Sequence, residues 1–240
     1  MDKREAWLKT IEEEERRLAP ELQRLKRIIE EYREQRLTLK KQLEKEIVRE
    51  EFSSDGLTIH RGYYCPSPVQ DIIVGGCKRG RLLKRMAANS KPTYKYGFNA
   101  EGELILVYSG GAVELIIRKA QTETGLFLMD RALDITSITE CAFRSDGKIA
   151  SYTHAFCVPL GTKYHIMIYP HTYKEEIYSY SEEGLLEAVD TYWSYRRQRY
   201  FFQHDDEGYL SSFTFVGLDS NGEIEYEDDR VREIKLKRKV

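Results

Sequence analysis

Two hydrophobic periods divide the chain, and the change between them falls near residue 51. Before it, apolar residues recur at alternating steps of three and four, which is the period of an amphipathic helix. After it, they recur at every second position, as in Leu104, Leu106 and Tyr108, which is the period of a strand with one buried face. The pattern predicts an α+β protein, with a helical segment at 1–51 and a β-sheet domain at 52–240.

The helical segment is dominated by Glu, Lys, Arg and Leu, which are strong helix formers. Pro20 divides this segment, because proline is tolerated in the first turn of a helix but not in its interior. We therefore expect helices at about 3–18 and 20–50, arranged as a helical hairpin or as one kinked rod.

The second of these helices carries an apolar stripe. The stripe consists of Leu22, Leu25, Ile29, Tyr32, Leu39 and Leu43, and Arg36 stands at the one position that interrupts the series. Such a stripe packs on the sheet or on the first helix, or it pairs with a second copy of the chain as a coiled coil. Residues 22–43 are therefore a candidate homo-oligomer interface.

A short motif recurs five times in the β domain. It has two large residues two apart, a glycine four positions after the second, and an aliphatic residue two positions after the glycine. Glycine supplies the positive φ of a tight turn, and the aliphatic residue returns near the aromatic as a cross-strand pair. The turn glycines are Gly102, Gly147, Gly184, Gly208 and Gly222, and residues 52–56 are a degraded sixth copy. The irregular spacing excludes a strict solenoid and predicts an antiparallel β-meander of roughly ten strands.

This motif resembles the tyrosine/aspartate repeat of Rhs-type bacterial proteins, Tyr-x-Tyr-Asp-x-x-Gly-x-Leu. Two copies keep the aspartate, at Asp205 and Asp219, whereas two others depart from the pattern with Arg144 and Ser181. The resemblance covers residues 94–226, and five hairpins are too few to enclose a toxin. Small proteins with such hairpins look like the immunity partners of bacterial polymorphic toxins. The resemblance therefore implies an immunity protein that occludes a cognate toxin domain.

Charge narrows the class of partner. The 38 Lys and Arg residues nearly balance the 40 Asp and Glu residues, and the net charge of −2 argues against a general nucleic-acid binder. Acidic residues nevertheless gather on the last two predicted hairpins, with aromatic residues among them. The expected partner-binding residues are Asp205, Asp206, Glu207, Tyr209, Phe213, Glu223, Glu225, Tyr226, Glu227, Asp228 and Asp229.

These acidic residues have two interpretations. Charged side chains protect a sheet edge from unwanted pairing. They also complement a basic partner, such as a nuclease toxin domain whose cleft attracts phosphate. Glu223, Glu225 and Glu227 are two apart, so a regular strand would present all three on one face.

The sequence shows no specific catalytic motif, and we expect neither an enzyme nor a cofactor. His154 and Cys157 are close in sequence, but residues three apart on a strand point to opposite faces. The basic stretch 78–86 predicts a short amphipathic helix on the sheet or, as an alternative, an anion or nucleic-acid site. The four cysteines form no Cys-x-x-Cys pair and are expected to be reduced. Whether Cys65 and Cys77 bind a metal stays open.

The N-terminus runs into acidic residues, and the longest apolar runs are too short to span a bilayer. We therefore expect a cytoplasmic protein without membrane association. The leading hypothesis is a protein-binding immunity protein, and the alternative is a structural or assembly protein that oligomerises through its N-terminal helices.

Overall fold

The computed structural model describes residues 3–54, 61–67, 80–84, 92–129, 133–159, 166–219 and 221–234. Its helices are α1 (Lys3–Arg33), α2 (Arg36–Glu46) and the short 3-10 helices η1 (Gly62–Tyr64) and η2 (Pro170–Thr172). Its strands are β1 (Arg49–Ser54), β2 (Arg81–Leu82), β3 (Tyr94–Phe98), β4 (Leu104–Ser109), β5 (Ala112–Lys119), β6 (Thr122–Met129), β7 (Asp134–Phe143), β8 (Ile149–Pro159), β9 (Ile166–Ile168), β10 (Lys174–Tyr180), β11 (Leu186–Trp193), β12 (Arg196–His204), β13 (Leu210–Leu218) and β14 (Ile224–Glu233).

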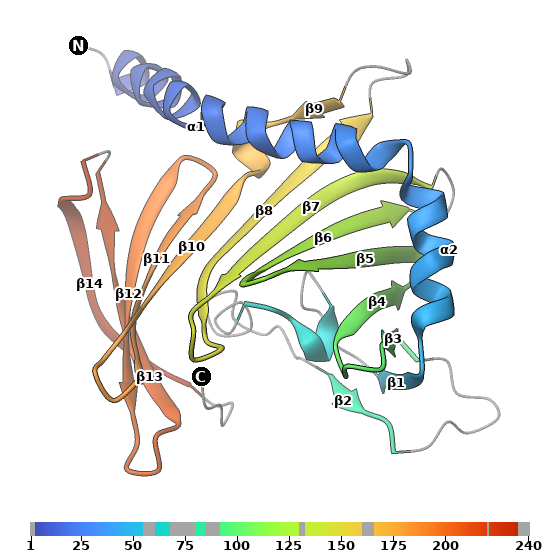
Figure 1. Ribbon diagram of the computed structural model, residues 1–240. Coiled ribbons are helices and arrows are strands. Elements are labelled where there is room, and N and C mark those ends of the chain that lie inside the picture. The colour runs from blue at the N-terminus through green and yellow to red at the C-terminus, as the bar shows by residue number, and fades with distance from the viewer. Residues whose placement is uncertain are drawn as a thin grey trace.

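All the described strands belong to one antiparallel sheet. Its order is β14-β13-β12-β11-β10-β8-β7-β6-β5-β4-β3-β1-β2, and β9 pairs with β8 beside this path. Figure 1 shows the sheet strongly curved, with α1 crossing one end of it and α2 running along the ends of β4 and β5. The expected α+β architecture with an antiparallel meander is confirmed. The sheet has 14 strands rather than roughly ten, because short or charged segments such as Arg49–Ser54 lack a clear alternation.

The five predicted turns share one backbone hydrogen-bond pattern. In the first turn the Gly102 amide donates to the Asn99 carbonyl, and the Asn99 amide donates to the Glu103 carbonyl, both at 3.0 Å. The same two bonds recur in the other four turns, and a register shift accompanies each of the five. This is the pattern of a hairpin closed by a glycine bulge. All five turn glycines have φ between 77° and 84°, so the predicted positive φ is confirmed.

The predicted cross-strand pairing is also confirmed. In each hairpin the second large residue of the motif lies opposite the returning aliphatic residue. The five pairs are Phe98 with Leu104, Phe143 with Ile149, Tyr180 with Leu186, His204 with Leu210, and Leu218 with Ile224. In the degraded sixth copy, Asp55 and Gly56 lie outside the described residues.

The prediction that the helices divide at Pro20 is wrong. Helix α1 continues through Pro20 and ends at Arg33. Leu18 and Leu25, on either side of the proline, are both buried in the same core cluster, so packing holds the two halves in one helix despite the lost backbone hydrogen bond. The corner falls instead before Arg36, whose guanidinium donates to the carbonyls of Arg33 and Leu133. The interruption of the apolar stripe thus marks the end of α1.

The apolar stripe of the helices packs on the sheet. Leu25, Ile29 and Leu43 are buried in one cluster with strand residues that include Leu115 and Leu126. The sheet-packing alternative for the stripe is therefore confirmed. Two further clusters pack against the opposite face of the sheet, which we call the inner face; they centre on Tyr200 and Phe213 and on Tyr96 and Phe98. In the described part of the chain, no helix is long and apolar enough to cross a membrane.

Candidate functional site

Strand β13 separates the expected partner-binding residues into two groups. Asp205, Asp206 and Glu207 lie in the turn before β13, and Glu223 lies in the turn after it. Because β13 has nine residues, the two turns are about 30 Å apart. The acidic residues of the last two hairpins therefore do not form one continuous surface.

The aromatic residues among them have different environments. Phe213 is buried in the inner-face cluster, with its ring centroid 5.9 Å from that of Tyr200. It is therefore not an accessible anchor, contrary to the expectation. Tyr209 is half-buried, whereas Tyr226 is 48% exposed. The Tyr226 hydroxyl accepts a 3.1 Å hydrogen bond from Gln198. Tyr226 is thus the one aromatic of the three with a half-exposed ring.

Four of the expected partner-binding carboxylates are exposed on or next to the last strand. We call Glu223, Glu225, Glu227 and Asp229 the edge surface. They lie on or next to β14, which ends the strand order and pairs only with β13 in the described sheet. The edge surface therefore lies on a strand that is hydrogen-bonded to β13 on one side. No described strand pairs with its other side.

The expectation of one regular face for Glu223, Glu225 and Glu227 is wrong. Glu223 precedes β14, and its amide donates to the Asp219 carboxylate at 2.9 Å. The ladder also shifts register between Gly217 and Leu218, directly opposite this part of β14. A bulge of this kind re-aims side chains, so the three glutamates do not share one regular strand face.

Asp228 lies within the same strand but is engaged by basic neighbours. Arg230 donates to both carboxylate oxygens at 2.8 and 2.7 Å, and Arg232 donates at 2.8 Å. The hydrogen bond from Arg230 is the largest cause that lowers the pKa of Asp228, to about 2. Asp228 therefore organises β14 rather than presenting a free charge.

The acidic turn before β13 has neighbours that the sequence did not suggest. The strand order places the β10–β11 turn between the β7–β8 turn and the β12–β13 turn. Lys148 of the β7–β8 turn donates a hydrogen bond to the Gly184 carbonyl of the β10–β11 turn. Glu182, Glu183, Asp205, Asp206 and Glu207 are all exposed there, and we call them the turn surface. In four of the five turns the residue before the glycine is acidic, but only the strand order shows which turns are adjacent.

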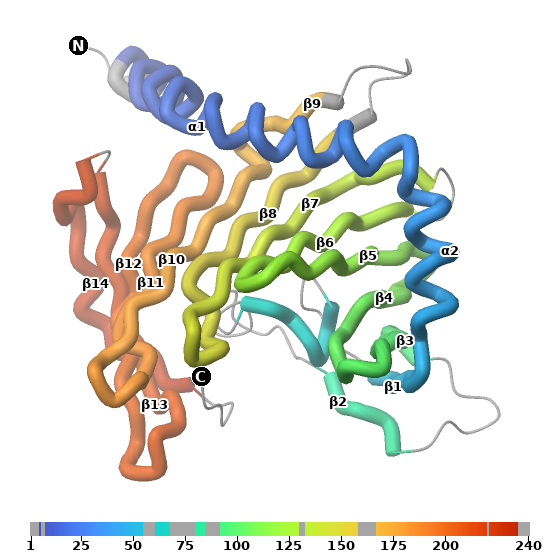
Figure 2. Tube along the Cα trace, viewed as in Figure 1, coloured from blue at the N-terminus to red at the C-terminus, as the bar shows by residue number. Residues whose placement is uncertain are grey.

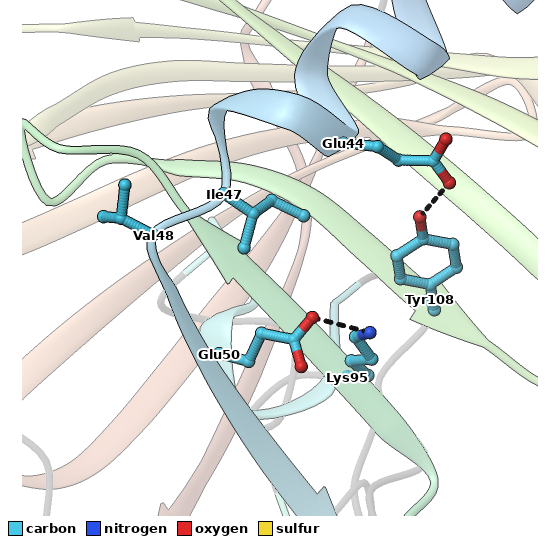
Figure 3. Close-up of a pocket in the computed structure, with 6 residues that line it drawn as sticks. All are labelled: Glu44, Ile47, Val48, Glu50, Lys95 and Tyr108. Atoms are coloured by element: carbon cyan, nitrogen blue, oxygen red, sulfur yellow. Dashed lines mark hydrogen bonds and ion pairs between the residues drawn. The ribbon is translucent and has the colours of Figure 1, made fainter.

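A hollow beside α2 has a volume of about 340 Å³ and is shown in Figure 3. The Tyr108 hydroxyl donates to Glu44 at 2.7 Å, and Lys95 forms an ion pair with Glu50 at 2.6 Å (Figure 3). Lys40 also pairs with Glu44, and this hydrogen bond is the largest cause that lowers the pKa of the Glu44 carboxyl. Because its charges are paired with one another, the hollow is best explained as the joint between α2 and the sheet.

A buried ion cluster attaches residues 61–67 to the inner face of the sheet. Arg61 donates to Glu114 at 2.9 and 2.7 Å and also to Glu123, and all three side chains are only 3% exposed. Burial would raise the pKa of Glu123, but the charges and hydrogen bonds of Arg61 and Arg118 together outweigh it and lower that pKa. Gly125 leaves room for the cluster, since a Cβ there would lie 2.1 Å from a Glu114 oxygen. This cluster is a structural clamp.

Further along the inner face, Ser67 donates to the fully buried Glu176 at 2.6 Å. His154 is also buried, and burial followed by the charge of Lys174 lowers its pKa to about 3. Cys157 belongs to the helix-side cluster with Leu25. His154 and Cys157 therefore lie on opposite faces of the sheet.

The basic stretch 78–86 is described only in part. Residues 81–82 form β2, which pairs with Ser53 and Ser54 of β1, so the amphipathic helix expected there is wrong at these positions. The free edge of β1 provides the backbone hydrogen bonds that hold β2 in the sheet. Lys78, Arg79, Arg85 and Cys77 lie outside the described residues. Cys65 is buried, and its thiol donates to the Ser67 carbonyl at 3.6 Å.

Comparison with known proteins places the chain in no family. No protein-family model matches its sequence, and no curated protein matches it at a significant level.

Proposed function

We propose that this chain is a protein-binding protein of the immunity type, which occludes a basic toxin domain with its edge surface. The observation that carries the proposal is the position of Glu223, Glu225, Glu227 and Asp229. All four are exposed, Glu223 in the turn before β14 and the other three on β14 itself, where no described strand covers that edge of the sheet. The likeness of the hairpins to tyrosine/aspartate repeats supplies the immunity context.

The physical basis is complementarity of charge on a rigid scaffold. Four carboxylates in a short segment attract a basic cleft over several ångströms and speed its approach. The half-exposed ring of Tyr226 adds apolar area beside them, and tyrosine is enriched among residues that dominate binding energy. Occlusion of a toxin needs such a surface and requires no catalytic group of its own.

Edge protection is the competing explanation of the same residues. Charged side chains and bulges both prevent pairing between sheet edges, and β14 has both. The two explanations differ in one respect. Edge protection is retained when the sign of the charges is reversed, whereas binding to a basic partner is not.

Self-assembly through residues 22–43 has less support. Leu25, Ile29 and Leu43 already lie in the core with the strands. A coiled coil built on the same stripe would have to lift α1 and α2 from the sheet and expose that apolar surface. The folded chain therefore favours an interface outside the helices.

Co-purification tests the proposal. The chain is co-expressed with the protein encoded by the adjacent gene, and a complex that survives size-exclusion chromatography and protects cells from that protein supports an immunity role. A neighbour that is non-toxic, or that forms no complex with the chain, contradicts it.

A further inference from the structure

The first half of α1 passes the ends of β11 and β12 (Figure 2). A second groove lies there, on the opposite side of the sheet from the buried ion cluster. Its volume is about 230 Å³. Arg17 of α1 forms part of one wall, and Tyr192 and Arg197 lie on the floor. Tyr192 and Arg197 are direct partners across β11 and β12, so their side chains lie on the same face of the sheet. The groove thus brings together residues far apart in sequence.

The two guanidinium groups share a single buried carboxylate. Glu14, which is only 4% exposed, accepts from Arg17 at 2.8 Å and from Arg197 at 3.0 Å. Arg17 uses only its Nε in this contact, and Arg197 uses only one terminal nitrogen. A guanidinium group carries five N–H donors. Among the described residues, most of the donors on these two arginines therefore have no acceptor in the protein.

The Tyr192 hydroxyl adds a third donor. Tyr192 is only 4% exposed, and its hydroxyl makes no hydrogen bond of normal geometry to any residue in the described ranges. A buried hydroxyl without a partner is unfavourable by an amount similar to a lost hydrogen bond. Arg17 lies over the same ring, 4.8 Å from its centroid. Two cations and a buried hydroxyl thus line one groove with donors to spare.

We propose that this groove binds a small oxyanion, of the carboxylate or phosphate type, held by Arg17, Arg197 and the Tyr192 hydroxyl. An oxyanion supplies the acceptors that these donors lack, and planar guanidinium groups match its geometry. Glu14 and Glu175 balance the charges of the two arginines, so the unused N–H donors, and not a net positive charge, favour an anion. The far end of the groove is lined by Gly222, which precedes Glu223 of the edge surface. The oxyanion site itself does not rest on the proposed immunity role.

Glu175 sets a limit on the affinity. It lines the groove and lies directly opposite Tyr192 across β10 and β11. Its carboxylate repels a bound anion, so the site should be weak in the native chain, with saturation in the millimolar range. The same repulsion provides a variant that should bind more tightly. Glu175→Gln removes the negative charge and nearly keeps the shape of the side chain, so it should strengthen anion binding.

Titration of the full chain with inorganic phosphate and, separately, with acetate tests the site. Binding is followed through the side-chain N–H signals of the arginines by nuclear magnetic resonance. A saturable shift of Arg17 and Arg197 is expected with at least one probe, and the tighter probe identifies the type of anion. Tyr192→Phe should weaken binding about tenfold, as expected for a hydrogen bond to a charged group.

The matched control is Tyr195→Phe, which removes a hydroxyl that donates to Glu15 outside the groove at 3.0 Å. This variant should bind as the native chain does. Tyr192→Phe should keep its folded state, because it removes a hydroxyl that has no partner, so weaker binding cannot be attributed to unfolding. Three results would each overturn the site: no saturable shift with either probe, unchanged affinity in Tyr192→Phe, or weaker binding in Glu175→Gln.

Discussion

The ring of Tyr226 lies directly over Gly217, its partner across β13 and β14. A Cβ on Gly217 would come within 1.9 Å of a ring carbon, so glycine is required for this contact. The position of the ring also allows its hydrogen bond from Gln198. The edge strand is therefore fixed by side-chain packing as well as by its ladder.

Gly217→Ala should push the Tyr226 ring outward and break the bond to Gln198. Loss of that bond and of the packing should lower the free energy of unfolding by about 1 kcal/mol. Urea denaturation measures the loss, and Tyr226→Phe, which removes only the hydrogen bond, is the control. Equal stability of Gly217→Ala and the native chain would show that the contact is unimportant.

The turn glycines should resist substitution for a different reason. Gly147 has φ of 81° and no atom within 4 Å of an added Cβ, so only backbone strain opposes a side chain there. Gly147→Val should lower the free energy of unfolding by about 1–3 kcal/mol. Gly147→Asn should lower it less, because asparagine tolerates positive φ. If valine and asparagine behave alike in urea denaturation, φ is not the cause.

Arg61 should contribute far more to the stability of the fold than an exposed arginine in a similar ion pair. Arg61→Leu leaves Glu114 buried without its cation and leaves Glu123 with Arg118 alone, which should destabilise the fold by about 3–5 kcal/mol. Arg199 makes a two-point contact with Asp190 at 2.6 and 2.8 Å, but both side chains are partly exposed. Arg199→Leu should therefore change stability by less than about 1 kcal/mol. Thermal unfolding compares the two variants, and similar losses would contradict the clamp.

Acid should weaken the same cluster. The folded-state pKa of Glu123 lies below its unfolded value, so its contribution is complete above about pH 4.3 and is lost as pH falls through the folded pKa. The free energy of unfolding should thus decrease on acidification. Glu123→Gln should be less stable at neutral pH and should show a flatter pH dependence, measured by urea denaturation across the acid range. Glu182→Gln, in an exposed turn, is the control that should keep the native slope.

Variants of the apolar stripe on the helices distinguish packing on the sheet from self-association. Ile29→Ala removes a fully buried side chain from the cluster between helix and sheet and should cost about 2–5 kcal/mol. Leu37→Ala alters a residue that is 40% exposed and should cost far less. Sedimentation measures the oligomeric state of both variants. A change in oligomeric state without loss of stability in Ile29→Ala would favour the coiled coil instead.

The hairpins could be predicted from the sequence because their signals are local. Gly102 and Leu104 fix a turn and its returning pair within seven residues of Phe98, and no distant contact is needed. The helix boundary could not be predicted, because Pro20 is a local signal that was overridden by the burial of Leu18 and Leu25 against the sheet.

The candidate sites depend on strand order, which the sequence does not state. Asp205 and Glu223 are close in sequence, but β13 carries them to opposite ends of the sheet. Arg17 and Tyr192 are far apart in sequence, but α1 brings them into contact. Local composition therefore identified acidic residues without identifying the surfaces that they form.

The most direct test of the central claim is the binding of the partner by Glu223→Lys/Glu225→Lys/Glu227→Lys. The matched control, Glu182→Lys/Glu183→Lys/Asp206→Lys, reverses three charges on the turn surface. Association with the product of the adjacent gene is measured for both variants at low and high salt. The edge variant should associate more slowly and bind at least about tenfold more weakly, with a smaller difference at high salt, and the control should bind as the native chain does. Unchanged affinity and unchanged salt dependence in the edge variant would contradict the claim that the edge surface binds a basic partner.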